Sequence, residues 1–457
     1  MKILGITAEY NPFHNGHRYH LQRSMEMTGA DYSVAVMSGS FTQRGEPAVL
    51  DKWTRSRLAV QNGVDLVLEL PFLYACSRGE IFASGAVDIL RGIGATHISF
   101  GSESGDLEAL QSLVTGMRMR SGEIDEIRLQ EMQKGDSFAR SLQRAVEKVL
   151  GASAAQLMAE PNNILAIEYL KRIDCWNSMG PSDGGCRNRI EPCTVKRFGS
   201  GYGSLNEEAG FAGATVLRKM VADGVSCSDG ESADRGTAAG DGSAADGGED
   251  ITAGCSDAKA QLVDMLSQYM PSDSAEALAG AGSREAAEHN EFVMLQGELM
   301  RTGSSELSTI YCMGEGLENK FKKEIVRVSS MEGFISSMVS KRYTEAAIRR
   351  LTTYVLMGIR AYQPEMKPYA RVLAAGVKGR ELLKLIKKEE LATIPVITNI
   401  NKQEDDCSEV RETLRYDILS ADLYNIIMQR SLYDCSDRVM MPYIERWRDM
   451  SKTARKF

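Results

Sequence analysis

The sequence predicts an α/β protein in which a Rossmann-like domain with a parallel sheet is followed by a mainly α-helical C-terminal domain. Short apolar runs alternate with helical segments over the first hundred residues, as in a parallel sheet with right-handed crossovers. The runs VAVM at 34–37 and LVLEL at 66–70 are almost continuously apolar, which is typical of strands buried on both faces. From residue 261 onward the chain is predominantly helical by pattern and rich in Leu, Met, Arg and Lys.

The expected elements follow one another at the spacing of βαβ units. Strands are predicted at residues 2–7, 32–37, 65–70 and 97–100. Helices are predicted at residues 16–27, 52–61 and 83–90. Most of 106–173 is helical by pattern, with one helix starting at the Pro-Asn-Asn step 161–163. A further strand is expected at 192–198 and a short helix at 212–221.

Composition divides the chain into three parts. Residues 222–258 consist mainly of Gly, Ser, Ala and Asp, and they carry nine acidic residues against one base, Arg235. Such a segment cannot bury enough apolar area to offset its ordering entropy, so it is predicted to be a disordered insertion. We therefore expect one domain at 1–221, an acidic low-complexity insertion at 222–258, and a helical, partly basic domain at 259–457.

Charge is segregated along the chain in a way that the net charge conceals. The formal net charge is −8, and the segment 222–258 alone accounts for this value, so the remainder is balanced. Residues 319–388 hold sixteen Lys or Arg against five Glu, a local excess of eleven positive charges. This pattern indicates an anion-binding face, although solvated helix faces produce the same pattern.

The overall composition is that of a globular protein of a reducing compartment. Hydrophobic residues make up 43% of the chain and charged residues 25%. No run approaches the roughly 18 apolar residues of a membrane helix, and residues 1–7 carry no signal-peptide pattern. The nine cysteines are scattered without a CxxC pair, which argues against a disulfide scaffold or a zinc site. A cytoplasmic location and no membrane partner are therefore expected.

The stretch EYNPFHNGHRYH at 9–20 holds three of the five histidines and follows the first predicted strand directly. Ligands of open parallel sheets bind at the carboxyl ends of the strands, where the next helix also points its free N–H groups. His14 and His17 are three residues apart across the start of that helix, so both imidazoles can face one ligand. Gly16 lets the backbone approach closely. The loop carries no GxxxxGK[ST], so it is not a P-loop.

The HxGH spacing of His14, Gly16 and His17 resembles the signature of the nucleotidyltransferase and class I aminoacyl-tRNA synthetase superfamily. In that superfamily the two histidines hydrogen-bond the phosphates of ATP while charge builds up at the α-phosphorus. The resemblance implies in-line attack on the α-phosphate with pyrophosphate leaving, catalysed mostly by positioning and electrostatics.

Further sequence motifs, in the same order along the chain, restrict the resemblance to one family. They comprise 9–20, MSG at 37–39, QRGEPA at 43–48, KWTR at 52–55, 63–71, FGSE at 100–103, PNNIL at 161–165, TVKR at 194–197, EGLE at 315–318, KRYT at 341–344 and RVL at 371–373. Together they cover most of 1–220 and 290–390, and they resemble the bacterial tRNA(Met) cytidine acetate ligases. That family makes N4-acetylcytidine at wobble position 34 of elongator tRNA(Met).

The resemblance implies an ATP-dependent carbon–nitrogen ligase that activates acetate as acetyl-adenylate and releases AMP and pyrophosphate. By this resemblance His14 and His17 are the catalytic residues, and ATP lies along the first loop. The implied loop contacts are Thr7, Ala8, Glu9, Tyr10, Asn11, Pro12, Phe13, His14, Asn15, Gly16, His17, Arg18, Tyr19 and His20. Further implied contacts are Gly101, Arg197 and one asparagine of the PNN step, either Asn162 or Asn163. Mg²⁺ is expected to help neutralise the triphosphate, although no ligand set for it is identifiable.

The basic part of the C-terminal half is the expected tRNA-binding region. Lys341 and Arg342 open a predicted helix that continues with Arg349 and Arg350, and all four are interpreted as phosphate contacts to tRNA. The family has a Ser-Ala-Thr-x-Ile-Arg helix start, whereas this chain reads GATVLR at 213–218, which retains Arg218 and lacks the serine. No DNA partner is expected, and the oligomeric state is open.

Two other functions fit parts of these observations. An adenylyltransferase that joins a nucleotide to a small phosphorylated metabolite would share the HxGH loop, but such enzymes are usually compact single domains. A non-catalytic tRNA-binding protein would share the basic half, but it has no physical reason to retain His14, Gly16 and His17.

Overall fold

The computed structural model describes residues 1–179, 189–197, 205–206, 210–230, 251–360, 366–403 and 410–445. Its centre is an eight-stranded mixed sheet in the order β10-β8-β3-β2-β1-β4-β5, with β9 beside β8. The strands are β1 (Ile3–Ala8), β2 (Tyr32–Ser38), β3 (Leu66–Leu70), β4 (His97–Ser102), β5 (Glu191–Lys196), β8 (Ala370–Ala375), β9 (Val396–Ile397) and β10 (Tyr443–Ile444). A separate two-stranded hairpin is formed by β6 (Leu205–Asn206) and β7 (Phe211–Ala212).

The five N-terminal strands pair in parallel, as the alternation of apolar runs and helices predicts. In β2 all seven residues are buried, and in β3 all five are buried. One face packs Val34, Val36 and Leu68 against helices, and the other packs Ala35 and Met37. The predicted parallel α/β sheet is thus confirmed, with both faces covered.

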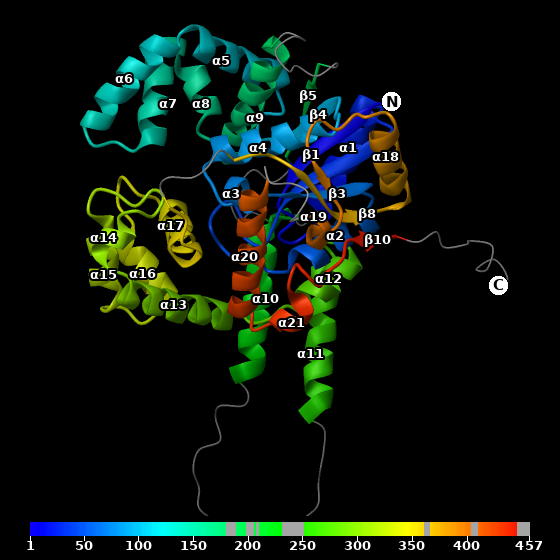
Figure 1. The fold of residues 1–457 in the computed structure, drawn as a ribbon, viewed down its shortest axis with the longest axis vertical. Helices are drawn as coiled ribbons and strands as arrows, with labels where there is room; N and C mark the ends of the chain where they lie inside the picture. The colour runs from blue at the N-terminus through cyan, green and yellow to red at the C-terminus, as the bar shows by residue number, and fades with distance from the viewer. Residues whose placement is uncertain are drawn as a thin grey trace, which may run out of the picture.

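Helices lie on both faces of the sheet (Figure 1). The face that carries Ile3 and Leu66 packs against α4 (Gly79–Gly92), α5 (Leu107–Met119), α9 (Pro161–Ser178) and α18 (Val377–Lys388). The opposite face packs against α1 (Asn15–Thr28) and α2 (Lys52–Gln61). Short helices α3 (Phe72–Ala75), α19 (Ile400–Gln403) and α21 (Leu432–Cys435) lie in connections.

Three groups of helices extend from the sheet (Figure 1). An arm consists of α5, α6 (Ser121–Gln133), α7 (Phe138–Leu150) and α8 (Ala152–Leu157), and α9 returns from it. A second group shares its own apolar core and contains α13 (Arg284–Arg301), α14 (Ser304–Leu307), α15 (Leu317–Ile325), α16 (Met331–Met338), α17 (Glu345–Met357) and α20 (Arg411–Ile427). A third contains α10 (Ala214–Gly230), α11 (Ile251–Leu266) and α12 (Ser272–Ala279). None of the helices in the described ranges is long and apolar enough to cross a membrane.

The structure corrects the predicted domain boundaries in two respects. The segment 259–457 is not an independent helical domain, because its strand β8 pairs antiparallel with β3 and β10 pairs with β8. The predicted insertion 222–258 is also too wide, since α10 runs to Gly230 and α11 begins at Ile251. Its central part, 231–250, lies outside the described residues.

Candidate active site

The loop between β1 and α1 holds the two signature histidines in a reciprocal capping arrangement. His14 is the N-cap of α1, and its Nδ1 accepts a hydrogen bond from the Gly16 backbone N–H at 3.1 Å. The backbone N–H of His14 in turn donates to Nδ1 of His17 at 3.2 Å. The two rings stack with their centroids 3.7 Å apart and an angle of 25° between planes. The HxGH spacing therefore fixes both imidazoles through the helix start itself.

This arrangement also sets the protonation of the pair. Burial, and after it the charges of Arg197 and Arg218, lower the pKa of His14 to about 3. The pKa of His17 is well below its ordinary value for the same reason, burial first, with His14 and Arg197 contributing. Both imidazoles are therefore neutral, and because each Nδ1 accepts a backbone N–H, each ring carries its proton on Nε2. The site offers two stacked Nε2–H donors.

Two arginines from distant parts of the chain complete the charge of the site. Arg197 follows β5, and its side chain packs against Gly101 of β4, where a Cβ would lie 3.1 Å from the arginine Cγ. Burial, and after it the charge of Arg197, lower the pKa of His20 to about 4. Arg218 of α10 donates from Nη1 to the Asn11 carbonyl at 2.6 Å. Arg197 is exposed and Arg218 is half-buried, so this pair of guanidinium groups beside neutral histidine donors suits a polyanion that approaches from solvent.

The two candidate asparagines are held by Glu103, which follows β4. Its Oε2 accepts the Asn163 backbone N–H at 2.8 Å, and its Oε1 accepts the Asn162 side-chain amide at 2.6 Å. The buried Asn163 amide oxygen accepts the backbone N–H groups of Glu103 and Ser104 at 3.0 and 3.2 Å. The start of α9 and the loop after β4 are thereby locked together, and Asn162 remains the more exposed of the two asparagines.

The remaining residues of the first loop divide into core and surface positions. Tyr10 and Phe13 are buried in the sheet core, and the Tyr10 ring meets the His17 ring edge-on at 5.0 Å. His20 lies on the inner side of α1, with its Nε2 3.0 Å from the Ser99 hydroxyl. The side-chain amide of Asn15 donates to the carbonyls of Gly210 and Gln268 at 3.2 and 3.3 Å. Tyr10 and Phe13 thus pack against the His17 ring, whereas His20 and Asn15 hold α1 against neighbouring segments.

The outer loop positions keep part of their surface free. Thr7 and Ala8 at the end of β1 are half-buried, as are Glu9 and Tyr19, whereas Arg18 is exposed and Pro12 is buried. Tyr19 packs edge-on against Phe211 at 5.8 Å between ring centroids. Within the described residues, no group of three or more His, Cys, Asp or Glu could hold a metal ion.

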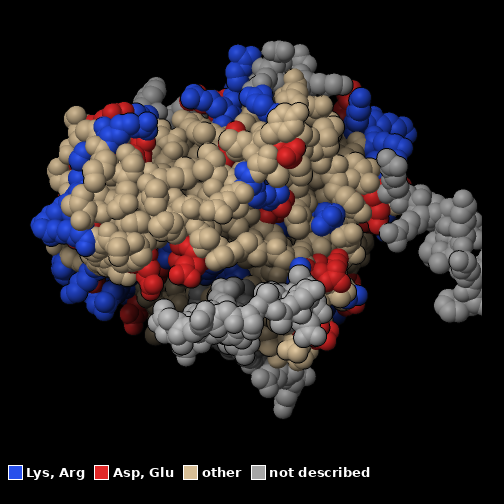
Figure 2. All heavy atoms as spheres, turned by 90° about the horizontal axis from the view of Figure 1, so that it is seen from below, with Lys and Arg blue, Asp and Glu red and all other residues tan. Residues whose placement is uncertain are grey.

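The four predicted tRNA contacts fall into two different settings. Lys341 and Arg342 are exposed just before α17, and Arg342 forms an ion pair with Glu315. Exposed lysines and arginines gather at the end of the molecule where α14–α16 lie (Figure 2). Arg349, in contrast, is largely buried against Glu46 and Glu345, at 3.5 and 3.0 Å. Arg350 donates from Nη1 to the Gln43 carbonyl at 3.1 Å.

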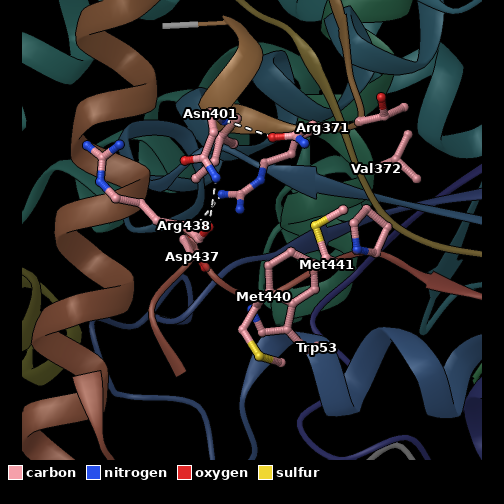
Figure 3. A pocket seen from close by; sticks show the side chains of 12 residues that line it. Trp53, Arg371, Val372, Asn401, Asp437, Arg438, Met440 and Met441 are labelled. Carbon is pink, nitrogen blue, oxygen red and sulfur yellow. Dashed lines mark hydrogen bonds and ion pairs between the residues drawn. The ribbon is translucent and has the colours of Figure 1, made fainter. Parts of the chain in front are cut away.

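Sequence reasoning gave no role to a set of buried charges at the carboxyl ends of β2 and β3. The fully buried Arg55 donates to four backbone carbonyls, those of Glu9, Ser38, Gly39 and Leu50. Lys52 bridges Glu69 and Asp437, each at 2.6 Å, and Arg371 pairs with the same two carboxylates at 3.0 and 2.7 Å. Arg371 and Asp437 border a small pocket beside Trp53 (Figure 3). The KWTR motif contains two of these residues, but only the fold reveals their partners.

Known proteins resemble this chain along most of its length. The model of the HIGH Nucleotidyl Transferase family matches residues 1–438. The chain is 34% identical over 436 residues to the tRNA(Met) cytidine acetate ligase of Thermoanaerobacter sp. (strain X514), which covers 94% of this chain and 96% of the relative. The same protein from Caldicellulosiruptor saccharolyticus is 34% identical over 398 residues, covering 85% and 86%.

A solved structure shares the whole fold. The crystal structure of Thermotoga maritima TmcAL bound with alpha-thio ATP superposes with a TM-score of 0.77 at 27% sequence identity, covering 98% of this chain and 100% of that chain. The resemblance stated from the motifs is therefore confirmed at the level of sequence and of structure. This chain belongs to the tRNA(Met) cytidine acetate ligase family, within the HIGH nucleotidyl transferases.

Proposed function

We propose that this protein activates acetate with ATP and transfers the acetyl group to the wobble cytidine, position 34, of elongator tRNA(Met). The observation that carries the proposal is the stacked pair of neutral histidines, which lies close enough to Arg197 and Arg218 for both charges to lower the pKa of His14. The relatives' name supports the substrate, and their coverage of at least 85% of both chains favours a full-length ligase over a compact adenylyltransferase.

In the first step a carboxylate oxygen of acetate attacks the α-phosphorus of ATP. The new O–P bond forms as the bond to the bridging oxygen breaks, and pyrophosphate leaves. Negative charge grows on the phosphate oxygens during this displacement, and preorganised donors stabilise it most where water is excluded. His14 and His17 would donate their Nε2–H groups to these oxygens, while Arg197 and Arg218 would balance the triphosphate charge.

In the second step the exocyclic amine of cytidine attacks the acyl carbon of acetyl-adenylate. The new C–N bond forms, the C–O bond to the phosphate breaks, AMP leaves, and the amine gives up one proton. This route needs no nucleophile from the protein. It requires instead that the nucleotide stay bound between the two steps, which the positive charges of Arg197 and Arg218 favour.

Further ATP contacts are proposed from the placement of the remaining residues. Gly101 leaves room for the Arg197 side chain, and the adenosine is proposed to bind next to both residues. Asn162 is the more exposed asparagine, whereas Asn163 is buried against the loop after β4. The first-loop residues 7–20 would border the nucleotide along the start of α1. Mg²⁺ would enter with the triphosphate, whose oxygens and water supply most ligands of this ion.

The tRNA contact is proposed at Lys341 and Arg342, because both are exposed in a region of excess positive charge. The side chains of Arg349 and Arg350 are engaged by Glu46 and the Gln43 carbonyl, so they support this role less. We propose the cytoplasm as the place of action, as expected for a tRNA-modifying enzyme.

Two assays test the proposal. Wild-type protein should catalyse acetate-dependent ATP–pyrophosphate exchange, and His14→Ala or His17→Ala should reduce its rate by on the order of 10²–10³-fold. Nucleosides from tRNA incubated with protein, ATP and isotopically labelled acetate should contain labelled N4-acetylcytidine by mass spectrometry. If both variants exchange at the wild-type rate, the histidines do not take part in acetate activation. If the cytidine carries no label, the protein is not the proposed ligase.

A further inference from the structure

The loop between β2 and α2, residues 39–50, lies between the histidine loop and helix α17. It folds back on itself, with a bridge between Phe41 and Pro47 and a hydrogen bond from the Ala48 N–H to the Ser40 carbonyl at 3.0 Å. Its tip is Gly45, with φ +85°, a left-handed conformation that L side chains rarely adopt. This loop is held by side chains from both of its neighbours.

On one side, the histidine loop holds the 39–50 loop by two side chains. The Glu9 carboxylate accepts the Gln43 backbone N–H at 2.7 Å. The Asn11 amide oxygen accepts the Val49 backbone N–H at 2.8 Å. Glu9 and Asn11 lie three to five residues before His14, so the 39–50 loop supports the segment that delivers His14 to the site.

On the other side, α17 holds the same loop at its tip. The buried Thr353 hydroxyl lies 2.9 Å from the Gly45 carbonyl and 3.0 Å from the Arg349 carbonyl of its own helix, and it shares its hydrogen between them. Arg350 donates from Nη1 to the Gln43 carbonyl at 3.1 Å. A Cβ on Gly45 would lie 2.5 Å from the Arg350 backbone nitrogen, so the loop and the helix touch backbone to backbone. Gln43 is thus bound through its N–H to the histidine loop and through its C=O to α17.

We propose that Arg350 and Thr353 are positioning residues for acetate activation, acting through the 39–50 loop on the histidine loop. The inference rests on the proposed function and deepens it. It assigns Arg350 to the ATP half of the reaction, although its position in a basic helix suggests tRNA. Because α17 starts directly after Lys341 and Arg342, the same helix also joins the proposed tRNA contact to the nucleotide site.

The test compares variants that keep shape but lose a donor. Thr353→Val removes the hydroxyl and leaves the Gly45 carbonyl without its partner, and Thr353→Ser retains it. Thr352→Val is the matched control, because the Thr352 hydroxyl donates only within α17, to the Arg349 carbonyl at 2.6 Å. Arg350→Gln removes the guanidinium, and Arg350→Lys restores a cationic donor.

Acetate-dependent ATP–pyrophosphate exchange, melting temperature and tRNA affinity are measured for each variant. Thr353→Val and Arg350→Gln should lower kcat of exchange by about 10-fold to 10²-fold, since a small misplacement of reacting groups has effects of this size. Thr352→Val and Thr353→Ser should keep the wild-type kcat, Arg350→Lys should recover part of it, and tRNA affinity should stay unchanged in all five variants.

Unchanged exchange in folded Thr353→Val and Arg350→Gln proteins would overturn the inference, as would a loss of tRNA affinity with exchange intact. If Thr353→Val fails to fold, the comparison of Arg350→Gln with Arg350→Lys decides. Failure of the proposed function itself would look different. The wild type would then bind a non-hydrolysable ATP analogue but show no acetate-dependent exchange.

Discussion

His14 and His17 obtain their orientation from backbone groups at the start of α1 and not from carboxylates. Among the described residues, the pair accepts hydrogen bonds from the N–H groups of Gly16 and His14 itself. Because no acid holds the rings in the charged form, burial keeps them neutral, and the Nε2–H donors remain available to an anionic ligand. The orientation of the two rings thus follows from four consecutive residues, and their neutral form follows from their burial in the surrounding core.

The neutral histidines predict how stability depends on pH. His14 and His20 have folded pKa values of about 3 and 4, below the unfolded value of about 6.5, so the unfolded chain binds more protons between these limits. The free energy of unfolding should fall as pH falls below about 6.5, by about 1 kcal/mol per histidine at pH 5.5. Chemical denaturation at pH 7.5 and 5.5 measures this. A His14→Gln/His20→Gln variant should lose less stability over the same interval, and equal losses would contradict the prediction.

Glu291 of α13 predicts a dependence of the opposite sign. Burial raises the pKa of this carboxyl to about 8, with Glu288 and Glu46 adding to the rise and Arg349 opposing it. The stability that its neutral form provides is present below the unfolded pKa and is lost as pH rises through about 8. Glu291→Gln should therefore be more stable than the wild type by about 1–3 kcal/mol at pH 8.5 and nearly equal to it at pH 4.5. The half-exposed Glu288→Gln serves as the control, and a difference independent of pH would argue against a titrating Glu291.

At the scale of elements, the N-terminal flank of α17 and its middle have different surroundings. Its N-terminal flank presents Lys341 and Arg342 to solvent, and its middle packs Arg350 and Thr353 against the 39–50 loop. The N-cap Thr344, whose side chain accepts the Ala347 N–H, separates the two regions. A basic helix in a sequence is therefore not one functional unit, because each residue's role depends on the face from which it projects.

The exposed flank of α17 predicts a salt-dependent RNA interaction. Lys341→Ala/Arg342→Ala should weaken tRNA binding and flatten the plot of log affinity against log salt by roughly one to two units, since each phosphate contact releases counterions. Circular dichroism should first confirm the fold, because arginine stems also pack against apolar surface. Lys387→Ala/Lys388→Ala, at the exposed end of α18, is the matched control. An unchanged slope in the Lys341→Ala/Arg342→Ala variant would indicate that the RNA binds to another surface of the protein.

At the scale of the whole molecule, the sheet joins the two ends of the chain. β8 enters from the C-terminal half and pairs with β3, and the ion cluster of Lys52, Glu69, Arg371 and Asp437 closes this junction in the interior. The cluster contains two positive and two negative side chains, and their mutual attraction offsets the free-energy cost of burying these charges. The proposed nucleotide site on β1, β4 and β5 therefore depends on a sheet that the N-terminal half does not complete.

This junction predicts that the N-terminal half does not fold alone. A fragment of residues 1–221 would expose the edge of β3 and leave Lys52 and Glu69 without Arg371 and Asp437. Breaking a buried ion network in this way typically costs about 3–5 kcal/mol, a large part of a domain's stability. The fragment should show no cooperative thermal transition by circular dichroism, whereas residues 1–445 should show one. A monomeric fragment with a sharp transition would contradict the prediction.

The sequence by itself determined the elements and the site that rest on local patterns. Short, almost continuously apolar runs and the helical patterns between them defined β1 to β4 and the intervening helices, and the HxGH spacing defined the histidine pair. These features need only neighbours along the chain. Only the tertiary structure decided the rest. The Ala-rich run ARVLAA forms β8 because β3 offers it an edge, and propensity alone favours a helix there. Likewise, Arg350 donates a hydrogen bond to Gln43, which is 307 residues away in the sequence. Tertiary packing brings the two together, and no local sequence pattern predicts such a contact.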